Sequence, residues 1–141
     1  MSVEDNLQAY LVTISAITTL TDHVLPVGNV HCVVPVQASQ DLPFPRIVYE
    51  KTGDAPWYSD AGDSGLKEAT FDIECQALTI HEAEAVRDAT YTALSGYKGA
   101  MGTSTVAVCF IDNESDTAYP AVHGGEEGVK SKTLEVRLQY R

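Results

Sequence analysis

The stretch Ala69-Thr-Phe-Asp-Ile-Glu-Cys-Gln-Ala77 alternates apolar and polar side chains along its whole length. A period of two places the apolar side chains on one face of a β-strand and the polar side chains on the other. The polar face would carry Thr70, Asp72, Glu74 and Gln76. The pattern therefore predicts a strand of a sheet that is covered on one face only.

An amphipathic helix is predicted directly after this strand. Thr79 stands three residues before Glu82, which is the spacing of a capping box at a helix start. Apolar and small residues then recur at helical spacing: Ala83, Val86, Ala89, Thr90, Ala93, Leu94 and Tyr97. Gly96 stands where a helix end belongs. Because most of these side chains are small, the helix can lie close to the sheet, and the rest of the chain must pack on this βα unit.

The remaining elements are predicted outward from this unit. Apolar residues at spacings of three and four predict a first helix from Ser2 to about Leu20. Short strands are predicted at 29–34, 46–50, 105–111 and 133–140, and the nearly continuous apolar run 105–111 is typical of a strand covered on both faces. The order α-β-β-β-α-β-β predicts an α+β domain with a mainly antiparallel sheet and two helices packed on one face.

Two long loop arms are predicted between strands. The segment from Lys51 to Gly65 is rich in Gly, Asp, Ser and Pro and should form the aromatic tip of a long-armed hairpin. The segment from Asp112 to Lys132 is polar, and an irregular loop of that length is uncommon unless it is functional or disordered. Trp57 and Tyr58, on the first arm, either fold back onto the domain or anchor a partner.

The length and the amino-acid composition predict one globular domain spanning residues 1–141. The formal net charge of -11 argues against binding nucleic acid through its phosphates. No apolar run approaches the length of a membrane span, so we expect a soluble protein with no membrane partner. The three cysteines are widely spaced and no signal-peptide pattern precedes them, which favours free thiols in a reducing compartment.

No catalytic, metal or cofactor site is predicted. The four histidines form no HExxH motif and no His/Cys pair at zinc-site spacing. Cys75 and Cys109 lie among apolar residues of predicted strands and should be core residues. The acidic segments 60–63 and 112–116 lack the ligand pattern of an EF-hand, and no serine lies in Gly-x-Ser-x-Gly. We therefore expect a protein that is not an enzyme.

The ordered set of local motifs resembles a phage tail-completion family, which includes tail terminators and tail-to-head joining proteins. After the first helix the resemblance runs through Leu42-Pro-Phe-Pro45 into Arg46-Ile-Val-Tyr-Glu50, then Gly65-Leu66 and the strand Thr70–Gln76. It continues through Glu82-Ala-Glu-Ala-Val-Arg87, Ala93-Leu-Ser-Gly96, Ile111-Asp-Asn-Glu114 and Val136-Arg-Leu-Gln-Tyr-Arg141. It covers essentially the whole chain.

This resemblance implies a structural virion protein that forms a ring, usually a hexamer, at the head-proximal end of a tail. Such a ring stops growth of the tail tube and joins the tail to the head connector. Its partners would be further copies of itself, the tail tube protein and the connector or neck protein. DNA would pass through the ring without specific binding. The protein would be assembled in the host cytoplasm, and no catalytic residues are implied.

Two hypotheses place this function on residues. Polar strand faces and the two arms would supply the partner interface: Trp57, Tyr58, Asp72, Glu74, Gln76, Glu126, Glu127, Glu135 and Arg137. Acidic residues would line the bore and repel DNA: Asp54, Asp60, Asp63, Glu126 and Glu127. The alternative for the acidic residues is that they keep the protein soluble before assembly.

Three other classes of function compete with this one: other phage ring proteins, ligand-binding domains and enzymes. A head-completion or neck ring protein and a tail tube subunit would also build rings on a small β-rich domain, but a tube subunit alone would form long polymers. A cytoplasmic domain that binds a small ligand would be a monomer with an occupied pocket. An enzyme is the third, and the sequence offers no residues for it.

Overall fold

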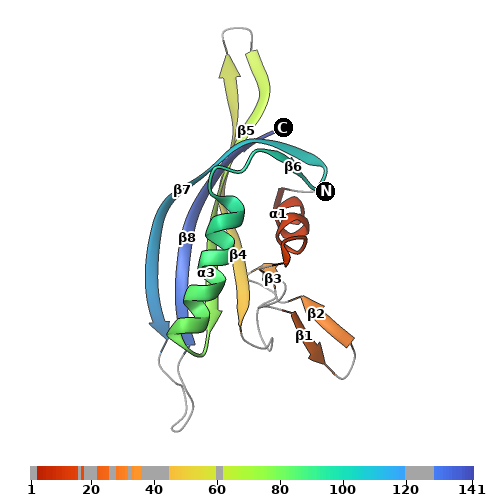
Figure 1. Ribbon diagram of the computed structural model, residues 1–141. Helices are drawn as coiled ribbons and strands as arrows, with labels where there is room; N and C mark the ends of the chain where they lie inside the picture. The colour runs from red at the N-terminus through yellow and green to blue at the C-terminus, as the bar shows by residue number, and fades with distance from the viewer. Residues whose placement is uncertain are drawn as a thin grey trace.

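The structure is a computed structural model that describes residues 3–15, 17, 22–25, 28–31, 33–35, 45–59, 62–119 and 129–141 (Figure 1). The helices whose bounds are described are α1 (Val3–Leu11) and α3 (Ile80–Leu94), and Ser15 and Ile17 are also helical. Its strands are β1 (Asp22–Leu25), β2 (Gly28–His31), β3 (Val33–Pro35), β4 (Arg46–Ser59), β5 (Gly62–Ala77), β6 (Gly99–Met101), β7 (Ser104–Tyr119) and β8 (Val129–Tyr140).

Six of these strands form one sheet in the order β3-β4-β5-β8-β7-β6. Its pairings are antiparallel except that of β3 with β4, which is parallel. The predicted strand lies at the centre, because β5 pairs with β4 on one side and with β8 on the other. β1 and β2 form a separate antiparallel pair. The prediction of an α+β domain with a mainly antiparallel sheet is confirmed.

Both helices lie on the same face of the sheet (Figure 1). α3 packs on β8, β5 and β7, and α1 lies beside β3 and β6. Tyr10 links α1 to the end of α3. Its hydroxyl donates a hydrogen bond of 2.8 Å to the carbonyl of Ala93, and its ring centroid lies 4.3 Å from that of Tyr97. The core between helices and sheet includes Leu7, Leu11, Ile47, Phe71, Ile73, Val86, Leu94, Leu134, Val136 and Leu138.

The ends of α3 follow the predicted signals. The Thr79 hydroxyl accepts a hydrogen bond from the backbone N–H of Glu82 at 3.3 Å, which satisfies one of the amides left open at a helix start. Gly96 follows the helix with a φ of 70°, a backbone conformation that favours glycine. Its N–H donates to the carbonyl of Cys109 at 3.0 Å and so ties the helix end to β7.

The first predicted helix is interrupted. α1 ends at Leu11, Val12 and Thr13 form a turn, and the described residues Ser15 and Ile17 are helical again. The Thr13 hydroxyl donates to the carbonyl of Tyr10 at 2.6 Å, and such a local bond competes with continuation of the helix. Ile17 is nevertheless fully buried in the core, as its place in the apolar pattern predicted.

The two predicted loop arms are largely strands. β4 continues to Ser59 and β5 begins at Gly62, so most of the segment 51–65 is a paired ribbon. β7 continues to Tyr119 and β8 begins at Val129, so only the middle of the segment 112–132 lies outside the described residues. The predicted long-armed hairpin is confirmed, but both arms are largely paired strand rather than loop, because cross-strand pairing overrides the low strand propensity of Gly and Asp.

Two of the predicted strands also differ. The run 29–34 is divided between β2 and β3, which pair with different partners. The segment 105–111 is not covered on both faces, since Val106 and Cys109 are buried whereas Ala107 and Phe110 are exposed. The helices cover only one side of β7, which explains why its apolar residues do not all become core.

Cys75 and Cys109 are buried free thiols, as predicted. Burial raises the pKa of each thiol to about 12. A thiol with so high a pKa holds almost no thiolate at neutral pH, so neither side chain is a nucleophile there. Within the described residues, no helix is both long enough and apolar enough to span a membrane.

Candidate assembly surface

The face of the sheet opposite the helices is polar, and we call it the outer face. Alternation puts Thr70, Asp72, Glu74 and Gln76 of β5 there, together with Thr133, Glu135, Arg137 and Gln139 of β8. All five of the predicted interface residues on these two strands thus share one face. The period of two was sufficient to place them, because their apolar neighbours are buried under the helices.

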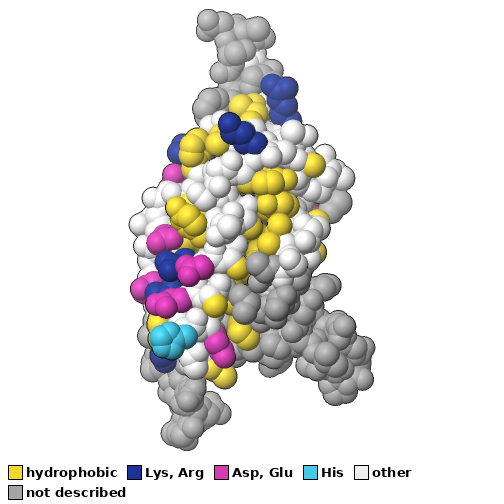
Figure 2. Space-filling model, viewed as in Figure 1, with side chains coloured by type: hydrophobic (Ala, Val, Ile, Leu, Met, Phe, Trp, Pro, Cys, Tyr) yellow, Lys and Arg dark blue, Asp and Glu magenta, His cyan; other side chains and the backbone are white. Residues whose placement is uncertain are grey.

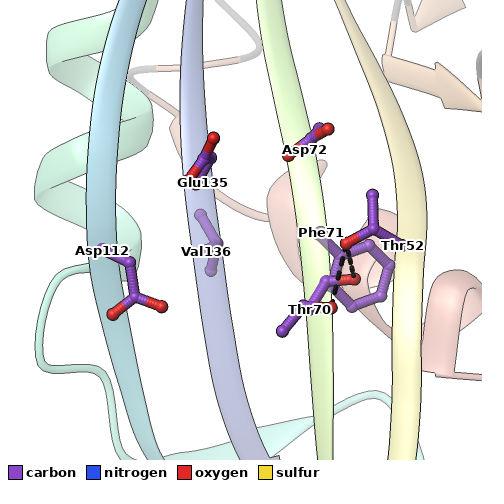
Figure 3. Close-up of a pocket in the computed structure, with 7 residues that line it drawn as sticks. All are labelled: Thr52, Thr70, Phe71, Asp72, Asp112, Glu135 and Val136. Carbon is purple, nitrogen blue, oxygen red and sulfur yellow. Dashed lines mark hydrogen bonds between the residues drawn. The ribbon is translucent and has the colours of Figure 1, made fainter.

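A shallow open hollow of about 370 Å³ lies on this face (Figure 3). Its lining comes from all four central strands: Thr52, Thr70, Phe71, Asp72, Asp112, Glu135 and Val136. Two of these residues sit at irregularities of the strand pairing, since Thr52 and Asp112 are the extra residues between Lys51 and Gly53 and between Ile111 and Asn113. Such bulges re-aim side chains and raise the local twist.

Three carboxylates form a row across the outer face. In the strand register Glu50 of β4 lies directly opposite Asp72 of β5, which lies directly opposite Glu135 of β8. Figure 3 shows Asp72 and Glu135 at the same level on neighbouring strands. None of the three carboxylates has an ion pair or a side-chain hydrogen bond within the described part of the chain. Like charges directly opposite each other destabilise a sheet, so this acidic row lowers the stability of the isolated subunit.

Arg137, two residues along β8 from Glu135, forms its ion pair outside the acidic row. Its Nη2 donates to Oδ1 of Asp112 at 3.3 Å, and its Nε lies 3.2 Å from Oδ2 of the same carboxylate. Its guanidinium also lies over the ring of Phe110, 4.7 Å from the centroid. This exposed phenylalanine is thereby partly covered by a charged side chain. Arg137 therefore contacts Asp112 and Phe110 rather than Glu135.

Two other predicted interface residues are also held within the subunit. Glu74 accepts a hydrogen bond of 2.6 Å from the hydroxyl of Ser131, which is 1% exposed. The Oε1 of Gln76 accepts a hydrogen bond of 2.7 Å from Nε of Arg46. These two residues fix the pairing of the strands around them. Of the predicted set on this face, Asp72 and Glu135 are the two with free side chains.

The β4–β5 hairpin projects beyond the rest of the sheet (Figure 1). β5 pairs with β8 only from Lys67 onward, whereas its pairing with β4 continues to Gly62. The outer part of the hairpin is therefore a ribbon of two strands. Such a ribbon is marginal alone in water, which favours a partner that packs on it. Trp57 and Tyr58 lie in this part of β4, and their side chains are outside the described residues.

The predicted bore residues are described only in part. Asp54 accepts hydrogen bonds of 3.1 and 2.9 Å from the Tyr140 hydroxyl, and Nζ of Lys51 lies 3.7 Å from its carboxylate. Burial, followed by this hydrogen bond, raises the pKa of Tyr140. The side chain of Asp63 lies outside the described residues, as do Asp60, Glu126 and Glu127 altogether. The bore hypothesis stays a prediction.

Asn6 has a structural role that the sequence did not indicate. It is 1% exposed, and its side chain donates to the Ser104 hydroxyl at 2.7 Å and accepts from the Thr103 backbone N–H at 3.0 Å. It thereby clamps the turn between β6 and β7 to α1. Gly102 in this turn has a φ of 60°, and a Cβ there would collide with Oδ1 of Asn6. No residue spacing could have predicted this contact, because the partners lie 97 and 98 residues apart.

Within the described residues, no group of three or more His, Cys, Asp or Glu side chains is arranged to hold a metal ion. The acidic row is consistent with that finding, since its carboxylates are spread along one line across three strands. A line of charges on an open face suits a broad contact with a macromolecule better than the enclosure of a single ion.

No protein-family model and no curated protein matches this chain. A solved structure described as "Virion of native gene transfer agent (GTA) particle" contains a chain with a similar fold. The TM-score is 0.64 at 16% sequence identity, and the match covers 99% of this chain and 97% of that chain. The two proteins therefore share a fold over essentially their whole lengths.

Proposed function

We propose that this protein is a structural component of a phage-like virion that assembles into a hexameric ring. The ring would sit at the head-proximal end of the tail, terminate growth of the tail tube and join the tail to the head connector. The observation that carries the proposal is the full-length likeness to a chain of a gene transfer agent virion. That likeness agrees with the order of motifs that resembles the tail-completion family.

The architecture supports an assembly role. The helices cover one face of the sheet, and the opposite face carries the acidic row Glu50, Asp72 and Glu135, which has no ion pair within the described residues. The β4–β5 hairpin extends past its neighbouring strand as a two-stranded ribbon. Both features lower the stability of a lone subunit, and contact with a second protein would compensate for each.

The two arms lie at opposite ends of the sheet. The turn of the β4–β5 hairpin is at the end where β8 finishes, and the connection from Tyr119 to Val129 leaves at the end where β8 begins (Figure 1). A joining protein has to meet one partner above and another below. We propose that the β4–β5 hairpin and the second predicted arm, residues 112–132, serve these two sides.

Electron microscopy of assembling tails tests this proposal. In an extract that lacks this protein, tail tubes should overgrow and fail to join heads, and the purified protein should restore joined particles of normal tail length. The double variant Trp57→Ala/Tyr58→Ala and, separately, a deletion of residues 118–127 should fold but fail to restore joining. Tyr91→Ala is the matched control, because Tyr91 is an exposed aromatic residue that belongs to α3 and to neither arm.

The images also separate the competing functions. Long tubes formed by the purified protein alone would identify a tube subunit instead. Full restoration of joining by both arm variants would show that the arms are not the interface.

A further inference from the structure

Some lysine and arginine side chains of this protein form ion pairs within the subunit, and others do not. All nine lie in the described residues, although the chain is strongly acidic. Lys51, Arg87, Lys132 and Arg137 form ion pairs with carboxylates of the same subunit. Lys67, Lys98 and Arg141 are exposed and form no ion pair within the described part of the chain.

These three unpaired cations lie at one end of the sheet, which we call the basic end. Lys67 is opposite Tyr140, the residue before Arg141, and Tyr140 is in turn opposite Val106. Val106 pairs with Gly99, the residue after Lys98. Adjacent strands are about 4.8 Å apart, so the three cations span roughly 15 Å across the strand ends. Figure 2 shows Lys and Arg side chains in the upper part of the helix face and most of the acidic side chains lower down.

The carboxylates nearest to the basic end are already engaged. Oε2 of Glu68 accepts a hydrogen bond of 3.4 Å from Gln139, and Asp54 is held by the Tyr140 hydroxyl. The three cations of the basic end are therefore exposed and have no ion pair within the described residues, on a protein with a formal net charge of -11. An acidic surface on a second copy would complement them.

The same chain supplies a surface of opposite charge that carries the same number of charged groups. The acidic row Glu50, Asp72 and Glu135 crosses three adjacent strands, a length of about 10 Å, and has no cation partner within the described residues. It lies on the outer face, away from the strand ends that form the basic end. We propose that the basic end of one copy docks on the acidic row of the next copy.

This inference rests on the proposed ring and specifies its subunit contact. The two surfaces differ, so each copy offers one to the neighbour on either side, which is the heterologous contact that a ring requires. Charge complementarity of this kind fixes the orientation of the copies and disfavours pairing of like surfaces. It also explains why the chain keeps a repulsive row of acids on its sheet.

Charge reversal with a mixing step tests the contact. In the variant Lys67→Glu/Lys98→Glu both surfaces are acidic, and in Glu50→Lys/Glu135→Lys both are basic. Each variant alone should raise the protein concentration at half-assembly by on the order of 100-fold, since like charges replace opposite charges. An equimolar mixture should assemble again, because an acidic end then meets a basic row and the reverse, and an even-numbered ring can alternate the two. Mass photometry reads the species directly.

The matched control is Ala85→Glu/Thr92→Glu, which adds acidic charge at exposed positions of α3 outside both surfaces and should assemble like the wild type. Assembly of either reversal variant within about threefold of the wild type, or failure of the mixture, would overturn the proposed contact and leave the ring itself intact. A wild-type protein that stays monomeric at every concentration would overturn the ring as well. Binding of duplex DNA that is lost in Lys67→Glu/Lys98→Glu without a change in assembly would assign the cations to DNA instead.

Discussion

Replacement of Asp72 by asparagine should stabilise the isolated subunit. Asp72 has an acidic residue directly opposite on each side, Glu50 and Glu135. Side chains that face each other across strands are about 5 Å apart, and two unit charges at that separation in water repel by about 0.8 kcal/mol. Asp72→Asn removes both repulsions. The free energy of unfolding should therefore rise by about 1 to 1.6 kcal/mol at low ionic strength, which corresponds to roughly 5 °C in Tm.

The neighbouring positions provide internal controls. Glu50→Gln and Glu135→Gln each remove one repulsion, so each should give about half the gain of Asp72→Asn. Adding Glu135→Gln to Asp72→Asn should give almost nothing more, because the shared repulsion is already gone. The gain should largely vanish at about 1 M salt, where the Debye length falls to about 3 Å.

Urea unfolding followed by circular dichroism measures these differences. The protein must be dilute enough to be monomeric, since assembly stabilises the folded state in proportion to subunit concentration. A variant Asp72→Asn that is no more stable than the wild type at low salt would refute the repulsive row. A gain that persists unchanged at high salt would show that its origin is not electrostatic.

Two further predictions concern the body of the subunit. Gly102→Ala should lower the free energy of unfolding by more than about 2 kcal/mol, because Gly102 has a φ of 60° and the added Cβ would collide with Asn6. Gly96 has a similar φ of 70° but open space around it, so Gly96→Ala should lower this free energy by only about 1 kcal/mol. Equal losses in urea unfolding would contradict the role of Asn6. The thiols of Cys75 and Cys109 have a pKa of about 12 in the folded protein and 9.0 when exposed. The unfolded chain therefore releases these protons at lower pH, and the free energy of unfolding should fall between about pH 9 and pH 12. Cys75→Ala should fall less steeply over this range, by up to about 1.4 kcal/mol per pH unit, and an unchanged slope would exclude the thiol as a cause.

Local patterns predicted the centre of the fold well. The alternation of β5, the cap of α3 at Thr79 and its end at Gly96 depend on neighbours in sequence, and all three are observed. The extended hairpin arms could not be read from residue types, because Gly53, Asp54 and Pro56 favour turns and become strand only through the pairing of β4 with β5. Likewise, α1 ends early where a local hydrogen bond at Thr13 competes with the helix.

The residues of the outer face could be predicted from the sequence, but the contacts between their charged side chains could not. Alternation placed Asp72, Glu135 and Arg137 on one side, and it also places Glu50 there, since Ile47 and Tyr49 point to the core. The register that sets Glu50 against Asp72 depends on two irregularities of the β4–β5 pairing, at Thr52 and between Pro56 and Tyr58, which no sequence signal marks. The capture of Arg137 by Asp112 depends on a second bulge in the same way. Which lysines and arginines form ion pairs depends on tertiary contacts, so the unpaired cations of the basic end could not be predicted from the sequence.

Native mass spectrometry of the purified protein tests the central claim most directly. Six copies of the 15.2 kDa chain give a closed assembly of about 91 kDa, and the account predicts this species at low ionic strength, with loss to monomer as salt screens the contact. A single 15.2 kDa species at every concentration and salt would contradict it.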